Sequence, residues 1–125
     1  MPRARKDTTP ITAEFPQYTG RSADLGDFTV VFETILAHDH DPAAFFKGLP
    51  DDRCSCPHWG LVVSGRVAMR YGDHEETYET GDAFYMPPGH LPLAGSGAEL
   101  ITFSPTAKLK KVNAVMAKNQ EGMRS

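Results

Sequence analysis

Glycines that recur every seven to nine residues constrain this chain more than any other feature of its sequence. Gly65, Gly72, Gly81 and Gly89 are separated by 7, 9 and 8 positions. Turn-forming residues at this spacing leave room only for short strands joined by tight connections. The spacing therefore predicts an all-β fold of the sandwich or barrel type.

The segments between the glycines have the composition of β-strands. Residues 28–36 are rich in β-branched and aromatic side chains, which favour strands. Polar and apolar residues alternate along the chain after Gly65, so that Val67, Met69 and Tyr71 share one face. Further strands are expected at residues 59–64, 75–79, 83–86 and 98–103.

Two helices are expected beside the strands. Asp41 can cap a short helix near residues 42–47, which a glycine and a proline would then end. A longer helix is expected near residues 105–118, where Ser104 can act as the cap. Its apolar stripe predicts packing on the outside of the barrel or on a second subunit, through Leu109, Val112, Val115 and Met116.

The composition fits one ordinary globular domain. The chain has 125 residues, and no stretch approaches the ~18 consecutive apolar residues that a membrane span requires. A formal net charge of -3 argues against the clustered basic surface of a nucleic-acid-binding protein. We expect a single domain over residues 1–125, with the barrel at about 28–104 and loose ends at 1–13 and 120–125.

The location and the cofactor class follow from what the sequence lacks. The basic N-terminal residues are not followed by an apolar run, so they do not read as a secretory signal. We therefore expect a cytoplasmic protein whose two cysteines, Cys54 and Cys56, are reduced. No phosphate-binding glycine loop, nucleophile elbow or zinc-protease helix motif is present, which argues against a nucleotide cofactor and against serine-hydrolase chemistry.

The densest group of metal-ligand residue types lies just before the second expected strand. In an extended chain, side chains two residues apart point to the same face, so Cys54, Cys56 and His58 would converge. Thiolate and imidazole are ligands that zinc prefers, and His90, behind a Pro-Pro-Gly turn, is the best-placed fourth ligand. The alternative is that both cysteines are small buried apolar residues, because zinc-binding cysteines are usually at least two residues apart. A disulfide between the two would be strained and is not expected.

Other candidate site residues have simpler interpretations. His38 and His40 alternate with acidic residues, but Asp41 is explained as a helix cap and the rest suits a solvated loop. Aromatic residues on the expected strands are interpreted mainly as core or interface residues. Three glutamates on those strands are interpreted as surface residues: Glu33, Glu79 and Glu99.

The segment 81–90, Gly-Asp-Ala-Phe-Tyr-Met-Pro-Pro-Gly-His, resembles the second sequence motif of the cupins. Gly81, Pro87 and Gly89 stand where that motif has glycine, proline and glycine. Gly65 corresponds to the turn glycine of the first cupin motif, and the short gap between the motifs is of the cupin type. The resemblance implies a jelly-roll β-barrel, often dimeric, with its site inside the barrel.

The ligand set departs from the one that this resemblance implies. The stretches around His58 and His90 are similar to small single-domain cupins without an assigned function. However, His58 stands at the position of the family's glutamate, and Pro92 at that of the second motif's histidine. The shifted set that remains is Cys54, Cys56, His58 and His90, at the place where cupins bind metal, with zinc favoured and nickel or iron as alternatives.

Three functions fit these predictions. The first is a module that binds a small molecule in the barrel, around a metal ion. The second is a metal-dependent enzyme of the isomerase, lyase or hydrolase type that acts on a small polar metabolite, which requires an open coordination position. The third is a metal-free interaction protein. A homodimer is the expected assembly, with no nucleic-acid or membrane partner.

Overall fold

Eight strands, one long helix and one 3-10 turn make up the described part of the chain. The computed structural model describes residues 3–15, 17–36, 47–49, 53–93 and 97–124. No helix in these ranges is both long and apolar enough to cross a membrane. The elements in chain order are η1 (Lys6–Thr8), β1 (Ile11–Phe15), β2 (Tyr18–Leu25), β3 (Phe28–Ile35), β4 (His58–Arg70), β5 (Glu75–Glu79), β6 (Ala83–Met86), β7 (Leu91–Pro92), β8 (Ala98–Pro105) and α1 (Thr106–Arg124).

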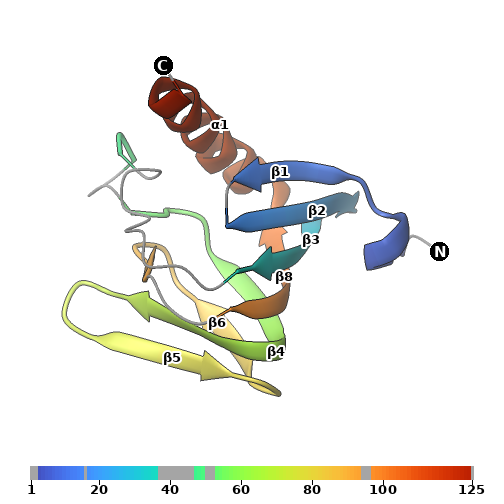
Figure 1. The fold of residues 1–125 in the computed structure, drawn as a ribbon, viewed down its shortest axis with the longest axis horizontal. Helices are drawn as coiled ribbons and strands as arrows, with labels where there is room; N and C mark the ends of the chain where they lie inside the picture. The colour runs from blue at the N-terminus through green and yellow to red at the C-terminus, as the bar shows by residue number, and fades with distance from the viewer. Residues whose placement is uncertain (1–2, 16, 37–46, 50–52, 94–96, 125) are drawn as a thin grey trace.

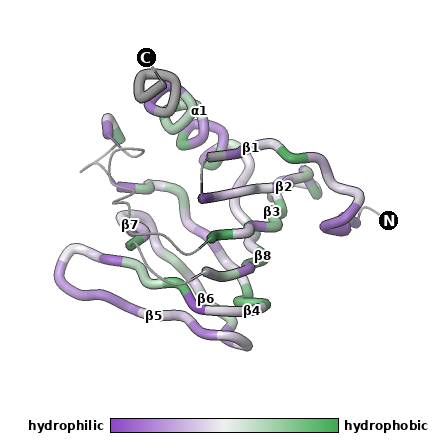
Figure 2. The backbone as a smooth tube through the Cα atoms, viewed as in Figure 1, coloured by the Kyte–Doolittle hydropathy of each residue, from purple (hydrophilic) through white to green (hydrophobic). Residues whose placement is uncertain are grey.

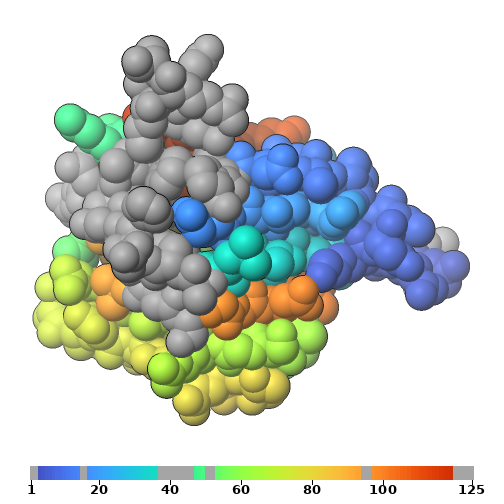
Figure 3. Space-filling view, viewed as in Figure 1, coloured from blue at the N-terminus to red at the C-terminus, as the bar shows by residue number. Residues whose placement is uncertain are grey.

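The strands form one antiparallel sheet, which confirms the all-β prediction. Its order is β1-β2-β3-β8-β4-β5, and β6 and β7 pair with β4. Figure 3 shows the strands as successive bands, from blue β1 and β2 through orange β8 to yellow β5. Helix α1 lies at the β1 end of the sheet, away from the β4–β5 hairpin (Figure 1). Hydrophilic residues run along β5 at the edge of the sheet (Figure 2), which protects its unpaired side from other strands.

The inner face of the sheet is set by the two-residue period of its strands. On β8, Ala98, Leu100, Thr102 and Ser104 are buried, and they alternate with more exposed residues. The core has two parts. One lies between β4, β6 and β8 and includes Val62, Val67, Met69, Tyr71, Phe84, Met86, Ala98 and Leu100. The other lies under helix α1 and includes Val31, Leu49, Cys54, Cys56, Leu109 and Val112.

Strand β4 is longer than the sequence predicts. The turn expected at Gly65 is absent, and β4 runs without interruption from His58 to Arg70. Its first part pairs with β6 and β8, and its last part pairs with β5 and β7. Gly65 has a φ of 80°, and the register against β8 shifts just before it, between Val62 and Ser64. The glycine therefore marks a bend inside one strand, not the end of a strand.

The C-terminal helix differs from its prediction at both ends. Ser104 and Pro105 belong to β8, and the helix begins at Thr106. Ser104 is not the helix cap, because its hydroxyl lies against the ring of His58 instead. At the other end the helix continues to Arg124, through residues expected to form a loose tail.

Two further expectations concern the ends of the barrel. The sheet begins at Ile11, well before residue 28, because β1 and β2 extend it beyond β3. The N-terminal residues expected to be loose include η1, where Lys6 forms an ion pair of 2.7 Å with Glu99 of β8. The short helix expected near residues 42–47 lies outside the described residues apart from Lys47, which is in a turn.

The bend in β4 leads to a prediction about stability. We expect Gly65→Ala to lower the free energy of unfolding by about 2–4 kcal/mol. A Cβ atom there would lie 2.1 Å from the carbonyl oxygen of Gly97, and the φ of 80° adds backbone strain. Gly81→Ala is the matched control, because φ is 91° but no heavy atom lies within 4 Å, so only about 1 kcal/mol should be lost. Urea unfolding compares the two, and equal losses would contradict the close approach at Gly65.

Candidate metal centre

A short backbone bridge brings two of the predicted ligands together. Cys54 and His90 pair as an isolated antiparallel bridge outside the main strands. The amide of Cys54 donates to the carbonyl of His90 at 3.0 Å, and the amide of Gly89 donates to the carbonyl of Cys54 at 2.8 Å. The two segments are far apart in sequence, and this bridge places their side chains next to each other.

The third ligand comes from the first residue of β4. His58 pairs with Met86 of β6. The ring centroid of His58 lies 4.9 Å from the ring centroid of His90. The sulfur of Cys54 is 3.6 Å from Nε2 of His58. One potential ligand atom from each of Cys54, His58 and His90 lies within 4.8 Å of the other two. Such a cluster can close around a single metal ion.

Hydrogen bonds at the far side of each ring orient the two histidines. Nδ1 of His90 lies 2.8 Å from the carbonyl oxygen of Pro87, which can only accept, so Nδ1 carries the proton and Nε2 has a free lone pair. Nδ1 of His58 lies 2.5 Å from the hydroxyl oxygen of Ser104, which can accept a hydrogen bond from the ring N–H. Metal-binding histidines usually donate their second ring nitrogen to such a partner, which fixes the ring and its tautomer.

Burial keeps the cluster uncharged in the absence of an ion. Cys54 and His90 are only 3% and 2% exposed. Burial raises the pKa of the Cys54 thiol to about 12. It also lowers the pKa of His58 to about 3, with a smaller contribution from His90, and lowers the pKa of His90. Two neutral imidazoles are ready to coordinate, whereas the thiol would have to lose its proton to an incoming cation.

The structure places Cys56 outside this cluster. The chain bends at Cys56 and becomes a strand only at His58, so the extended conformation that would align the two cysteines is absent. The Cys56 side chain is fully buried in the second core, where its polar neighbours are the hydroxyl of Ser104 and the carbonyl oxygen of Pro57, 3.4 Å from the sulfur. Burial raises its pKa to about 11. Cys56 thus matches the alternative interpretation, a small buried apolar residue.

The remaining sequence candidates lie elsewhere. His38, His40 and Asp41 fall outside the described residues. Trp59 and Tyr85 stack on each other on the outer face of the sheet, where both are exposed. The sequence interpretation missed several polar residues of the inner face. Strand alternation could have placed one pair of these there, Thr102 and Ser104.

The cluster can act as a three-ligand metal site. Two neutral nitrogen donors and one thiolate are a donor set suited to zinc and neighbouring metals. Among the described residues, no further histidine, cysteine, aspartate or glutamate joins this group. A site with three protein ligands leaves a coordination position for water or a small molecule.

The buried histidines predict a loss of stability in acid. Unfolded histidine takes up a proton below a pH of about 6.5, whereas folded His58 stays neutral until about pH 3, so stability falls as the pH drops between these values. We expect the share due to His58 to reach about 2–3 kcal/mol by pH 4.5. Urea unfolding of chelator-treated protein at pH 7 and pH 4.5 measures it.

Two variants isolate this effect. His58→Gln should remove the His58 share of the acid-induced loss. His74→Gln should leave that loss in place, because His74 is exposed and its pKa is raised, chiefly by its hydrogen bond to Asp73. The same pH dependence in both variants would contradict the buried neutral state of His58.

Comparison with known proteins identifies the fold. No protein-family model matches this chain, and no curated protein sequence does. Solved structures do match. An RmlC-like cupin from Shewanella frigidimarina NCIMB 400 is 18% identical, with a TM-score of 0.56 over 82% of this chain and 88% of that one. The polyketide cyclase RemF from Streptomyces resistomycificus is 15% identical, with a TM-score of 0.59 over 84% of this chain and 79% of that one.

A third match is the hydroxypropylphosphonic acid epoxidase from S. wedmorenis. It is 18% identical to this chain, with a TM-score of 0.59 over 83% of this chain. This chain spans only 59% of the epoxidase, and 56% and 60% of the apo and FeII structures of HppE. At these identities the matches establish the fold: it is a cupin-type fold, as the resemblance of residues 81–90 implies.

Proposed function

We propose that this cupin-fold protein binds a divalent metal ion through Cys54, His58 and His90, and that a small molecule completes the coordination of the ion. The observation that carries the proposal is the convergence of the three ligand atoms within 4.8 Å of one another. The hydrogen bonds that orient both histidine rings support it, and so does the similarity to a fold that includes FeII HppE.

Zinc is the metal that the donor set favours. A cysteine thiolate is a soft ligand and imidazole is a borderline one, and zinc accepts this combination readily. Iron sites of the two-histidine, one-carboxylate type need a carboxylate ligand. In this cluster the third ligand is Cys54, a thiol, which favours zinc over iron. Nickel and iron remain the alternatives, and the titration below is repeated with each of them.

The open coordination position decides between binding and catalysis. When bound, a divalent ion supplies Lewis-acid polarisation of an oxygen atom of its ligand. The residues of this chain keep water from the site: Cys54 and His90 are nearly inaccessible to solvent, and Met86, which pairs with His58, is 1% exposed. A small polar molecule with an oxygen donor would take the open coordination position, and an isomerase, lyase or hydrolase reaction would use the same position.

A cytoplasmic location agrees with this site. The proposed ligation requires Cys54 as a thiolate, and both cysteines are free. Thiols stay reduced in the cytosol, whereas an oxidising compartment would expose the site to oxidation.

Zinc titration of cysteine variants tests the metal site. We expect the wild-type protein to bind one zinc per chain, and Cys54→Ser to bind at least about a hundredfold more weakly. Cys56→Ser is the matched control, since Cys56 is a neighbouring buried cysteine that lies outside the cluster and should retain the wild-type affinity. Competition with a chelator of known affinity gives the dissociation constants. Equal losses in both variants would favour a four-ligand site, and no binding by the wild type would refute the proposal.

We also propose that two copies associate through the outer face of the sheet. This face carries a group of exposed apolar side chains, which no described element covers: Phe28, Trp59, Leu61, Val63, Tyr85 and Phe103. Trp59 links the group, because its ring contacts those of Phe28 and Tyr85. Since the group contains no charged residue, a second copy can pack on it by a two-fold axis without opposing like charges.

The mass of the protein in solution tests this interface. We expect a dimer for the wild type and a monomer for Leu61→Glu, because the new carboxylate would be buried in the interface without a partner. Ile11→Glu is the control, an equally exposed apolar residue on β1, 46% against 42%. Light scattering coupled to size exclusion measures the mass. A wild-type monomer, or a dimer that survives Leu61→Glu, would contradict the proposal.

A further inference from the structure

The proposed metal site has a charge imbalance. A divalent ion brings two positive charges, the Cys54 thiolate supplies one negative charge, and the two neutral imidazoles supply none. One positive charge would remain in a site where Cys54 and His90 are almost entirely buried and His58 is half-buried. A buried charge without a partner is costly, so a nearby carboxylate would strengthen metal binding.

One carboxylate lies on the inner side of the neighbouring strands. Glu33 of β3 accepts a hydrogen bond from the hydroxyl of Tyr18 at 2.6 Å and one from the hydroxyl of Thr102 at 3.2 Å. These partners come from β2 and β8, the strands on either side of β3. The sequence interpretation as a surface residue is therefore wrong, because the side chain is partly buried and held from both sides.

A glycine makes room for the tyrosine. Gly20 pairs with Glu33 across β2 and β3. A Cβ atom at Gly20 would lie 3.0 Å from the hydroxyl oxygen of Tyr18, so the ring passes directly over the glycine on its way to Glu33. The arrangement of Tyr18, Gly20 and Glu33 fixes one carboxylate at one place on the inner face.

Strand geometry places Glu33 on the same face of the sheet as the metal cluster. On β3, Glu33 and Val31 are on the same face, and Val31 packs in the same core cluster as Cys54. On β8, Thr102 holds Glu33, and Ser104, two residues further on the same face, contacts His58. Thr102 and Ser104 are one two-residue step, roughly 7 Å, apart along β8, so the residue that holds Glu33 and the residue that contacts His58 are neighbours on one face.

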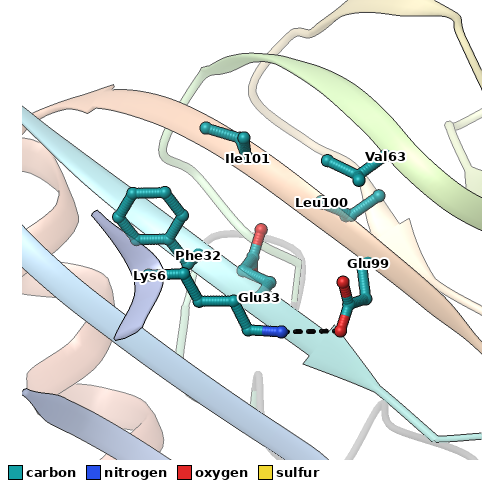
Figure 4. A pocket seen from close by; sticks show the side chains of 7 residues that line it. All are labelled: Lys6, Phe32, Glu33, Val63, Glu99, Leu100 and Ile101. Atoms are coloured by element: carbon teal, nitrogen blue, oxygen red, sulfur yellow. Dashed lines mark hydrogen bonds and ion pairs between the residues drawn. The ribbon is translucent and has the colours of Figure 1, made fainter. Parts of the chain in front are cut away.

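The electrostatics agree with this placement. Burial raises the pKa of Glu33, although the bonds from Tyr18 and Thr102 lower it. The charge of Glu33 also contributes to the raised pKa of Cys54, and Cys54 to that of Tyr18. The other charged groups near Glu33 pair with each other: Figure 4 shows Lys6 bonded to Glu99 beside a small pocket that Glu33 borders, with no bond from either to Glu33.

We propose that Glu33 is the counter-charge of the metal centre, a carboxylate that balances the positive charge left on the ion by Cys54 without coordinating it. This inference rests on the proposed metal site. It assigns Tyr18 and Thr102 as positioning residues, which hold the carboxylate at a fixed place beside the site.

Zinc binding to carboxylate variants tests the inference. We expect Glu33→Gln, which keeps the shape and removes the charge, to bind zinc roughly ten- to a hundredfold more weakly than the wild type. Glu99→Gln is the matched control on the neighbouring strand, where the carboxylate is exposed and paired with Lys6, and its affinity should not change. Glu33→Asp, which keeps the charge, should recover most of the affinity.

The outcomes separate the two proposals. If the wild type binds no zinc, nickel or iron, the metal site itself is refuted. If the wild type binds zinc and Glu33→Gln binds it equally well, or Glu33→Asp binds it as weakly as Glu33→Gln, only the counter-charge is refuted.

A measurement on the wild type covers the case in which Glu33→Gln does not fold. Carbon NMR of the side-chain carboxyl groups follows the titration of Glu33 directly. With zinc bound, Glu33 should lose its proton at a pH about one unit or more lower than without zinc. An unchanged titration would overturn the proposal.

Discussion

The pair of backbone hydrogen bonds between Cys54 and the turn at Gly89 and His90 is the contact on which the candidate site depends. It joins two connecting segments that belong to no long strand, and it does so beside the first residue of β4. Because the bond partners are main-chain atoms, the bridge forms without a metal ion. The site is therefore assembled in advance, and an entering ion would meet three donors that need little rearrangement.

The regular parts of the fold could be predicted from the sequence because they depend on local preferences. Turns at Gly72 and Gly81 and the strands between them follow from glycine conformation and from alternation. The prediction of a turn at Gly65 is wrong because a positive φ suits a bend within a strand equally well, and only the partner strand distinguishes the two. The prediction of a cap at Ser104 is wrong for a similar reason. A serine before a helix can cap it, but the hydroxyl of Ser104 lies against the ring of His58, which belongs to β4.

The kinds of ligand residue in the candidate site could be predicted, but which of these residues come together could not. The sequence brought out Cys54, Cys56, His58 and His90 together, and the structure gathers three of them and leaves Cys56 in the apolar core. The error comes from assuming an extended chain across a segment that bends. Glu33 could not be placed by pattern, because its position depends on which strands flank β3 and on a tyrosine that crosses a glycine from the next strand.

Alternation along β4 has a consequence for how the molecule can be observed. His58 and Trp59 are consecutive residues, so their side chains point to opposite faces of the sheet. Trp59 is the only tryptophan of the chain, and it lies on the outside between Phe28 and Tyr85. Its fluorescence will respond first to whatever touches the outer face, while events at the histidines reach it only through the backbone. Trp59 thus reports on the outer face of the sheet, while the backbone of β4 separates it from the histidines on the inner face.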